Sequence, residues 1–349
     1  LISFAGILIT YTLTPFILKQ VLKEAEDVSH YVRFLRIRIW GLPFLYVYQL
    51  RNALLVGTNN SKYLVAGTLA ETLSNVLLDY LLIFGKFGFP ALGFNGAAIA
   101  SVIAEFTGML VIFLVIRRKG IDKRFSLFKH FGLDKIRLQQ VLSMSGPIIF
   151  QHAISIISWW LFYLLIERNA GKEGLGISNT MRNLFGLFGV VSWSFAATSN
   201  AMVSNIIGQG KKEEVVSLIN KIIHLSTGMA IIVFILLNSF PGLFISIFGQ
   251  DELFTKDAIP VIRVVSLAMV LMSFGTVWLN AVTATGNSRV TFLIEAFAII
   301  LYCTYIYLVV EKYKLSLARG WMSEWLYWTT LFSLSFGYIR SGKWKRKVI

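Results

Sequence analysis

The sequence has few charged residues, which occupy 15% of its 349 positions, whereas an ordinary soluble domain carries roughly a quarter. Hydrophobic residues occupy 56% of the chain, and the mean hydropathy is +0.68. A soluble fold could not bury that much apolar surface. The composition therefore excludes an ordinary soluble domain and indicates a membrane protein.

Cysteine is nearly absent, and so are the common motifs of catalysis. The single cysteine, Cys303, lies in an apolar run and excludes an internal disulfide framework. No H-x-x-x-H, C-x-x-C or G-x-S-x-G pattern occurs. Gly337 to Lys343 fits G-x-x-x-x-G-K, but Trp344 follows where a nucleotide-binding loop needs Ser or Thr. We therefore expect a protein that is not an enzyme and that carries no cofactor.

The chain does contain a series of apolar runs of about 20 residues, each long enough to cross a hydrocarbon core of about 30 Å as a helix. The gaps between the runs hold turn residues, such as GTNNSK after Val56 and ATGNSR after Thr283. The expected fold class is an all-α, polytopic membrane protein. The ten expected spans are residues 1–20, 33–56, 64–85, 94–116, 138–165, 177–207, 214–241, 258–283, 289–310 and 321–339.

The net charge of +15 is concentrated in short segments between the apolar runs. Lys and Arg are densest in residues 117–137 and again in the C-terminal tail. This placement is typical of the cytoplasmic loops of membrane proteins and argues against a nucleic acid partner. We therefore expect a multi-pass protein of the cytoplasmic (inner) membrane, with 117–137 and the C-terminus in the cytoplasm and the lipid bilayer as its surroundings.

An internal repeat at an offset of 227 residues pairs Arg36 with Arg263 and residues 60–62 with 287–289. The chain starts with LISFAGILITYT, which lacks the features of a signal peptide, so we expect this end to lie within a larger protein. The repeat then predicts two pseudo-symmetric lobes of six helices, with ten of twelve transmembrane helices present. The expected divisions are an N-terminal lobe (1–116), a basic cytoplasmic linker (117–137) and a C-terminal lobe (138–349).

Polar residues inside two neighbouring spans indicate a cation site. Glu71, Asn75 and Asp79 are spaced four apart and share one helix face, and Ser101 and Glu105 do the same on the next span. Ionisable groups within a span cost at least about 2.5 kcal/mol, so they usually face a cavity or a partner. Their oxygens suit a small cation or a proton. The alternative is a hydrogen-bond network that only holds the helices together.

A second polar stripe, in the other half, indicates a solute cavity. Gln151, Ser155 and Trp159 lie on one helix face beyond Gly146-Pro147, and Arg182 and Asn280 are further candidates from later spans. Such a stripe suits an amphipathic or aromatic solute. The alternative is ordinary packing around a satisfied Gln.

The stretch SNVLLDYLLIFGKFGFPALGFNGAAIASVIAE resembles the multidrug and toxic compound extrusion (MATE) family, and SNIIGQGKKEEV and ATGNSR are similar to its later segments. The resemblance implies twelve helices in two lobes and export of organic cations in exchange for Na⁺ or H⁺. It places the cation site on Asn75 and Asp79, with Ser101 replacing a threonine. The acidic residue of helix seven is Ser155 here, and helix ten has no acidic counterpart, so the N-terminal lobe is favoured for coupling.

The resulting hypothesis is a monomeric antiporter, coupled to Na⁺ or H⁺, that exports small amphipathic or cationic organic compounds by alternating access. The nearest alternative is a flippase for a lipid-linked saccharide, which would need several Arg and Lys in its cavity for pyrophosphate. A membrane-embedded transferase would need clustered His or Asp at a membrane face, and none is evident. A partner protein without transport activity is the third alternative.

Overall fold

The computed structural model describes residues 2–21, 25–127, 132, 134–248 and 251–346. Every regular element in these ranges is a helix. Six of the described helices are long and apolar enough to cross a membrane. The predicted class, an all-α polytopic membrane protein, is confirmed.

The chain divides into two compact units, Leu1–Gly132 (unit 1) and Leu133–Ile349 (unit 2). The division falls within the expected linker 117–137, of which 128–131 and 133 lie outside the described residues. The earlier part of this segment forms the short helix α6 (Ile121–Arg124), and Ile121 is buried in the core of unit 1. The limits of the predicted lobes, at 116 and 138, stay a prediction.

Unit 1 differs from the expected spans at one place, the run 33–56. The chain there forms two helices, joined by a 3₁₀ turn at Ile39–Gly41. Pro43 explains the change, because it has no N–H to donate to the carbonyl of Ile39 and its ring crowds that carbonyl. The main helices of unit 1 are α1 (Ile2–Val21), α2 (Ala25–Arg38), α3 (Leu42–Gly57), α4 (Leu64–Phe84) and α5 (Phe94–Arg118).

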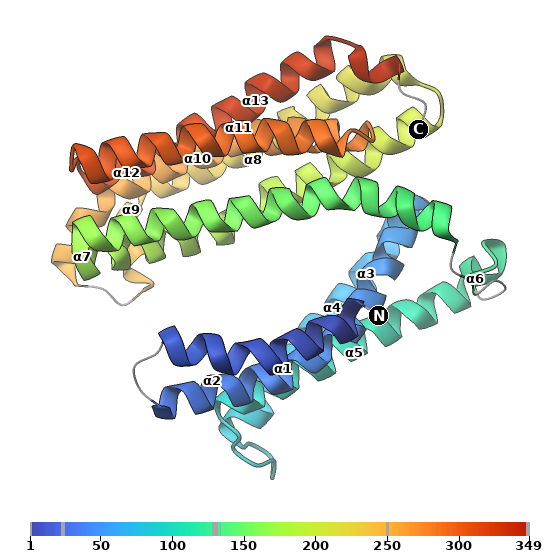
Figure 1. Cartoon of the computed structure of the whole chain (residues 1–349), viewed down its shortest axis with the longest axis horizontal. Helices are drawn as coiled ribbons and strands as arrows, with labels where there is room; N and C mark the ends of the chain where they lie inside the picture. The colour runs from blue at the N-terminus through green and yellow to red at the C-terminus, as the bar shows by residue number, and fades with distance from the viewer. Residues whose placement is uncertain (1, 22–24, 128–131, 133, 249–250, 347–349) are drawn as a thin grey trace. The chain divides into compact units, whose positions relative to one another are not determined.

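Helices α4 and α5 pack against each other (Figure 1), and α5 carries a stripe of small residues. Gly96, Ala100, Ala104 and Gly108 recur every four positions on α5, and all four are buried. Without a hydrophobic driving force in lipid, helices associate where small side chains let their backbones approach. This stripe therefore sets the register that brings the polar residues of α4 and α5 together.

In unit 2 the expected spans 138–165 and 177–207 form one element, α7 (Lys135–Gly208), broken only at Gly171. Gly171 has φ 65° and ψ −163°, a backbone conformation open almost only to glycine. The two spans are thus joined at a single residue instead of a loop. The other helices are α8 (Val215–Ser239), α9 (Pro241–Ser246), α10 (Glu252–Ala284), α11 (Ser288–Ile306), α12 (Leu317–Trp321) and α13 (Ser323–Arg340), and the π-helix Tyr307–Lys312 extends α11.

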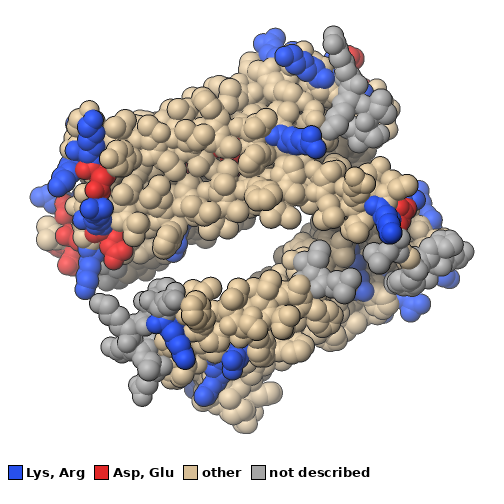
Figure 2. All heavy atoms as spheres, viewed as in Figure 1, with Lys and Arg blue, Asp and Glu red and all other residues tan. Residues whose placement is uncertain are grey.

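Helix α10 forms the centre of unit 2 and contacts α7, α8, α11 and α13. In the apolar 18-residue stretch of α10, 61% of the residues are buried, against at most 39% in the corresponding stretches of the other candidate spans. The outer helices instead expose large apolar side chains, such as Ile156 and Trp160 of α7. Figure 2 shows charged side chains mainly near the ends of the helices of this unit, with an uncharged surface between them. This is the distribution that a hydrocarbon layer imposes.

The close approach of α5 to α4 can be tested at Gly96. A Cβ atom there would lie 2.6 Å from the backbone oxygen of Leu82, so Gly96→Ala must push the helices apart. We expect a loss of about 1–3 kcal/mol in stability and a lower melting temperature in detergent. Gly57→Ala is the control, because a Cβ at that position has no neighbour within 4 Å. Equal melting temperatures for the two variants would contradict the packing.

Candidate functional site

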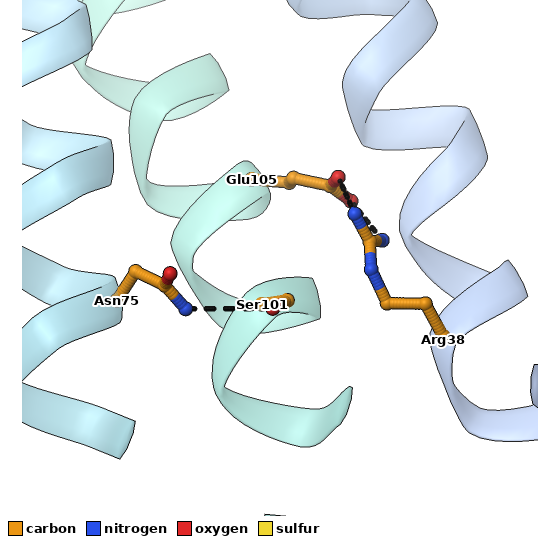
Figure 3. Close-up of polar contacts among 4 residues, drawn as sticks. All are labelled: Arg38, Asn75, Ser101 and Glu105. Carbon is orange, nitrogen blue, oxygen red and sulfur yellow. Dashed lines mark hydrogen bonds and ion pairs between the residues drawn. The ribbon is translucent and has the colours of Figure 1, made fainter. Parts of the chain in front are cut away.

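The polar residues of unit 1 meet where α4 faces α5. Asn75 Nδ2 donates a hydrogen bond to Ser101 Oγ at 3.4 Å (Figure 3). Asp79 lies one turn further along α4, and its Oδ1 atom is buried without a hydrogen-bond partner among the described residues. A buried carboxylate oxygen with no donor is a ligand that a cation or a proton could satisfy. The structure thus brings together Asn75 and Ser101, with Asp79 on the same face of α4.

Glu105, also predicted as a cation ligand, has a protein cation as its partner. Arg38 of α2 donates two hydrogen bonds to it, from Nη1 to Oε2 at 3.1 Å and from Nη2 to Oε1 at 2.6 Å (Figure 3). Gly41 makes room for the pair, since a Cβ atom there would collide with the Glu105 carboxylate. Such a bidentate pair neutralises a carboxylate that is only 4% exposed. Its predicted role in cation binding stays untested, and the geometry favours a structural one.

Glu71 lies on the same side of α4, half-buried against Gly108 of α5. A Cβ at Gly108 would lie 3.1 Å from Glu71 Cβ, which is a tight contact, so glycine lets α5 approach α4 closely at this point. Arg38, the partner of Glu105, was not predicted from the sequence, because it lies on another helix. It could have been found, since Arg38 lies inside the expected span 33–56 and a charged residue within a span usually has a partner.

Unit 2 contains a cavity of about 490 Å³ among α7, α10, α11 and α13. The five residues that the sequence assigned to a solute cavity all line it: Gln151, Ser155, Trp159, Arg182 and Asn280. Their role in binding a solute stays a prediction. What the structure adds is their common location, on both halves of α7 and on α10.

Aromatic side chains form much of the wall of this cavity. Trp159 packs edge-to-face against Phe185, with ring centroids 6.4 Å apart, and Phe185 stacks on Trp328 at 6.5 Å. Trp193 and Tyr327 line it as well. Aromatic faces attract flat rings and cations. The wall is therefore suited to an amphipathic organic molecule.

Glu295 of α11 is the most buried charged residue of the cavity wall, at 5% exposure, and sequence reasoning missed it. Its Oε2 accepts a hydrogen bond from Gln151 Nε2 at 2.7 Å, and its Oε1 accepts one from Tyr327 OH at 2.8 Å. The signal was present, because Glu295 lies within the expected span 289–310 and an ionisable residue in a span indicates a function. The prediction that helix ten lacks an acidic residue concerned the expected span 258–283, the tenth helix of the resembled family, and did not consider Glu295 in the next span.

The described residues contain no group of three or more His, Cys, Asp and Glu side chains placed to hold a metal ion. A hard cation such as Na⁺ would have to use amide and hydroxyl oxygens together with a carboxylate. The face with Asn75, Asp79 and Ser101 offers that combination.

The sequence comparisons identify relatives of this chain. A model of the MatE family matches residues 147–308. The chain is 27% identical over 362 residues to the "Probable multidrug resistance protein NorM" of Thermotoga maritima, covering 99% of this chain and 75% of that protein. It is 31% identical over 125 residues to the "Probable multidrug resistance protein YoeA" of Bacillus subtilis, covering 35% of this chain and 27% of that protein.

Solved structures share the fold. A MOP superfamily transporter from Pyrococcus furiosus matches with a TM-score of 0.87 and 16% identity, covering 99% of this chain and 78% of that chain. A multidrug resistance MATE family transporter of the MOP superfamily matches with a TM-score of 0.86 and 17% identity, covering 98% of this chain and 77% of that chain. The chain thus spans about three quarters of the Thermotoga relative and of both structures.

The ion pair of unit 1 can be tested by removing its cation. Arg38→Ala leaves Glu105 buried without a counter-charge, and we expect a loss of about 2–3 kcal/mol, below the roughly 3–5 kcal/mol of a fully buried pair, because the Arg38 side chain is 36% exposed. The readout is the melting temperature in detergent. Arg137→Ala is the control, since Arg137 pairs with Asp134 at 3.2 Å while 84% exposed, and such a pair contributes at most about 1 kcal/mol. Equal losses in the two variants would contradict this account.

Proposed function

Because this chain belongs to the MatE family of membrane transporters, we propose that it is an antiporter that exports an amphipathic or cationic organic solute in exchange for Na⁺ or H⁺. The observation that carries the proposal is the combination of two polar sites in a membrane protein. In unit 1 a buried carboxylate oxygen of Asp79 has no donor among the described residues, and unit 2 has an aromatic cavity with polar groups. An antiporter has to bind both a driving ion and a solute, and two separate sites allow the binding of one to be coupled to the binding of the other.

The coupling site in this proposal is the face of α4 and α5 with Asn75, Asp79 and Ser101. Asp79 supplies the charge. Its buried Oδ1 has no hydrogen-bond partner among the described residues, so binding a cation or a proton would offset the cost of burying it. Asn75 Nδ2 already donates a hydrogen bond to Ser101 Oγ, so the two side chains lie next to each other. Glu71 and Glu105 are the further candidate ligands in this proposal, and Arg38 already neutralises Glu105.

The solute site in this proposal is the cavity of unit 2. Its size, about 490 Å³, falls in the range of small-molecule sites, and its wall combines aromatic rings with a few polar groups. The flippase alternative has less support, because among the described residues that line this cavity Arg182 is the single Arg or Lys. A pyrophosphate headgroup would need several such cations.

The proposal includes location and partners. The protein lies in the cytoplasmic membrane as a monomer, with 117–137 and the C-terminus in the cytoplasm. The Lys and Arg bias of those segments supports the orientation. A small organic solute, the coupling ion and the lipids are its partners, and nucleic acid is not.

The coupling role is tested by Asp79→Asn in the protein encoded by the complete gene. We expect gradient-driven accumulation of ethidium in everted membrane vesicles to fall at least about tenfold, a cost of about 1.4 kcal/mol or more, because the charge that holds the ion is removed. Asp257→Asn is the control, since Asp257 is exposed near the start of α10. Accumulation that survives in Asp79→Asn at the wild-type rate would refute the assignment.

The solute cavity is tested by a pair of adjacent tryptophans. Trp159 lines the cavity, whereas Trp160 is 71% exposed and is not among the described residues that line it. Loss of one aromatic contact costs about 0.5–1.5 kcal/mol, so we expect Trp159→Ala to raise the apparent KM for ethidium about three- to tenfold. Trp160→Ala should leave this KM unchanged. A larger effect at Trp160 would place the solute elsewhere.

A further inference from the structure

Glu295 is a buried acid that forms no ion pair with a Lys or Arg among the described residues. It is 5% exposed, in the middle of α11 and between α7 and α13. A carboxylate in such a place costs several kcal/mol unless it gains a positive charge, and the smallest available one is a proton.

The groups around Glu295 are mostly neutral. Gln151 of α7 and Tyr327 of α13 donate one hydrogen bond to each carboxylate oxygen. The side chains that α10 brings to the cavity, Thr276, Leu279 and Asn280, carry no charge. The titratable and charged groups that face this region are His152 and Arg182 of α7, together with Tyr327 and Glu324 of α13. Glu324 is itself buried and accepts a hydrogen bond from Trp328 Nε1 at 2.9 Å.

We propose that Glu295, held by Gln151 and Tyr327, is a proton-binding site in the wall of the unit 2 cavity, separate from the coupling site of unit 1. The proposal deepens the function proposed above and rests on it only for the use of the proton in transport. Binding converts the carboxylate to a carboxylic acid. Release returns the proton to water in the cavity, and the carboxylate keeps the two hydrogen bonds that the structure shows.

The geometry selects a proton over Na⁺. Both oxygens of Glu295 already accept a hydrogen from a neutral donor, whereas Na⁺ needs several oxygen lone pairs directed at it. The amide of Gln151 can also turn over, so that its oxygen accepts a hydrogen bond from the protonated acid. The same three side chains therefore satisfy the charged and the neutral form of Glu295 without a change in packing.

Infrared difference spectroscopy of the purified protein, titrated across neutral pH, tests the site without any solute. We expect the carbonyl band of a protonated carboxylic acid at neutral pH, its partial loss in Glu295→Gln, and its full retention in His152→Asn, which removes the neighbouring base but no carboxyl group. Tyr327→Phe should shift the band, because the acid loses one hydrogen bond. Identical spectra of the wild type and Glu295→Gln would overturn the proposal.

Two further results separate this proposal from the proposed function. Saturating NaCl should leave the Glu295 band unchanged, and its removal by Na⁺ would overturn the choice of a proton. Asp79→Asn should abolish ethidium accumulation and keep the Glu295 band. If instead Asp79→Asn retains accumulation while the band persists, the coupling role of unit 1 fails and the proton site of unit 2 stands.

Discussion

A polar side chain in hydrocarbon costs free energy unless a partner satisfies it, and this constraint explains the buried polar contacts between the helices. Arg38 and Glu105 satisfy each other as charges, Asn75 and Ser101 as neutral groups, and Glu295 through neutral donors. Each of these contacts joins two or more helices. The same contacts that hold the bundle together therefore determine which polar groups are left free for a ligand.

Units 1 and 2 meet the constraint in different ways, and the difference matters for function. The ion pair of Arg38 with Glu105 fixes the charge of that carboxylate, because losing Arg38 leaves Glu105 buried without a counter-charge. Glu295 has only neutral donors, which tolerate either form of the acid. A carboxylate whose charge is fixed, such as Glu105, stabilises one structure. A carboxyl group that can change its charge, such as Glu295, can bind and release a proton.

Sequence periodicity predicted what lies on one helix, and it did not predict what lies across helices. Gln151, Ser155 and Trp159 share a face because positions four apart are neighbours on any α-helix, so their common cavity was foreseeable. The partners of Glu295 and Glu105 were not, since they depend on which helices face each other. The hydropathy pattern likewise predicted the spans and missed the 3₁₀ turn before Pro43, where one residue interrupts the helix expected over 33–56.

The unit 2 cavity depends on a residue that does not line it. Gln151 and Trp159 precede Gly171 on α7, and Arg182 and Trp193 follow it, yet all four line the same cavity. An unbroken helix would carry the second group away along its axis by about 1.5 Å per residue. The break at Gly171, at φ 65° and ψ −163°, returns the chain instead, and almost only glycine adopts that conformation. A Cβ atom there would meet no neighbour within 4 Å, so the requirement for glycine comes from the backbone and not from crowding.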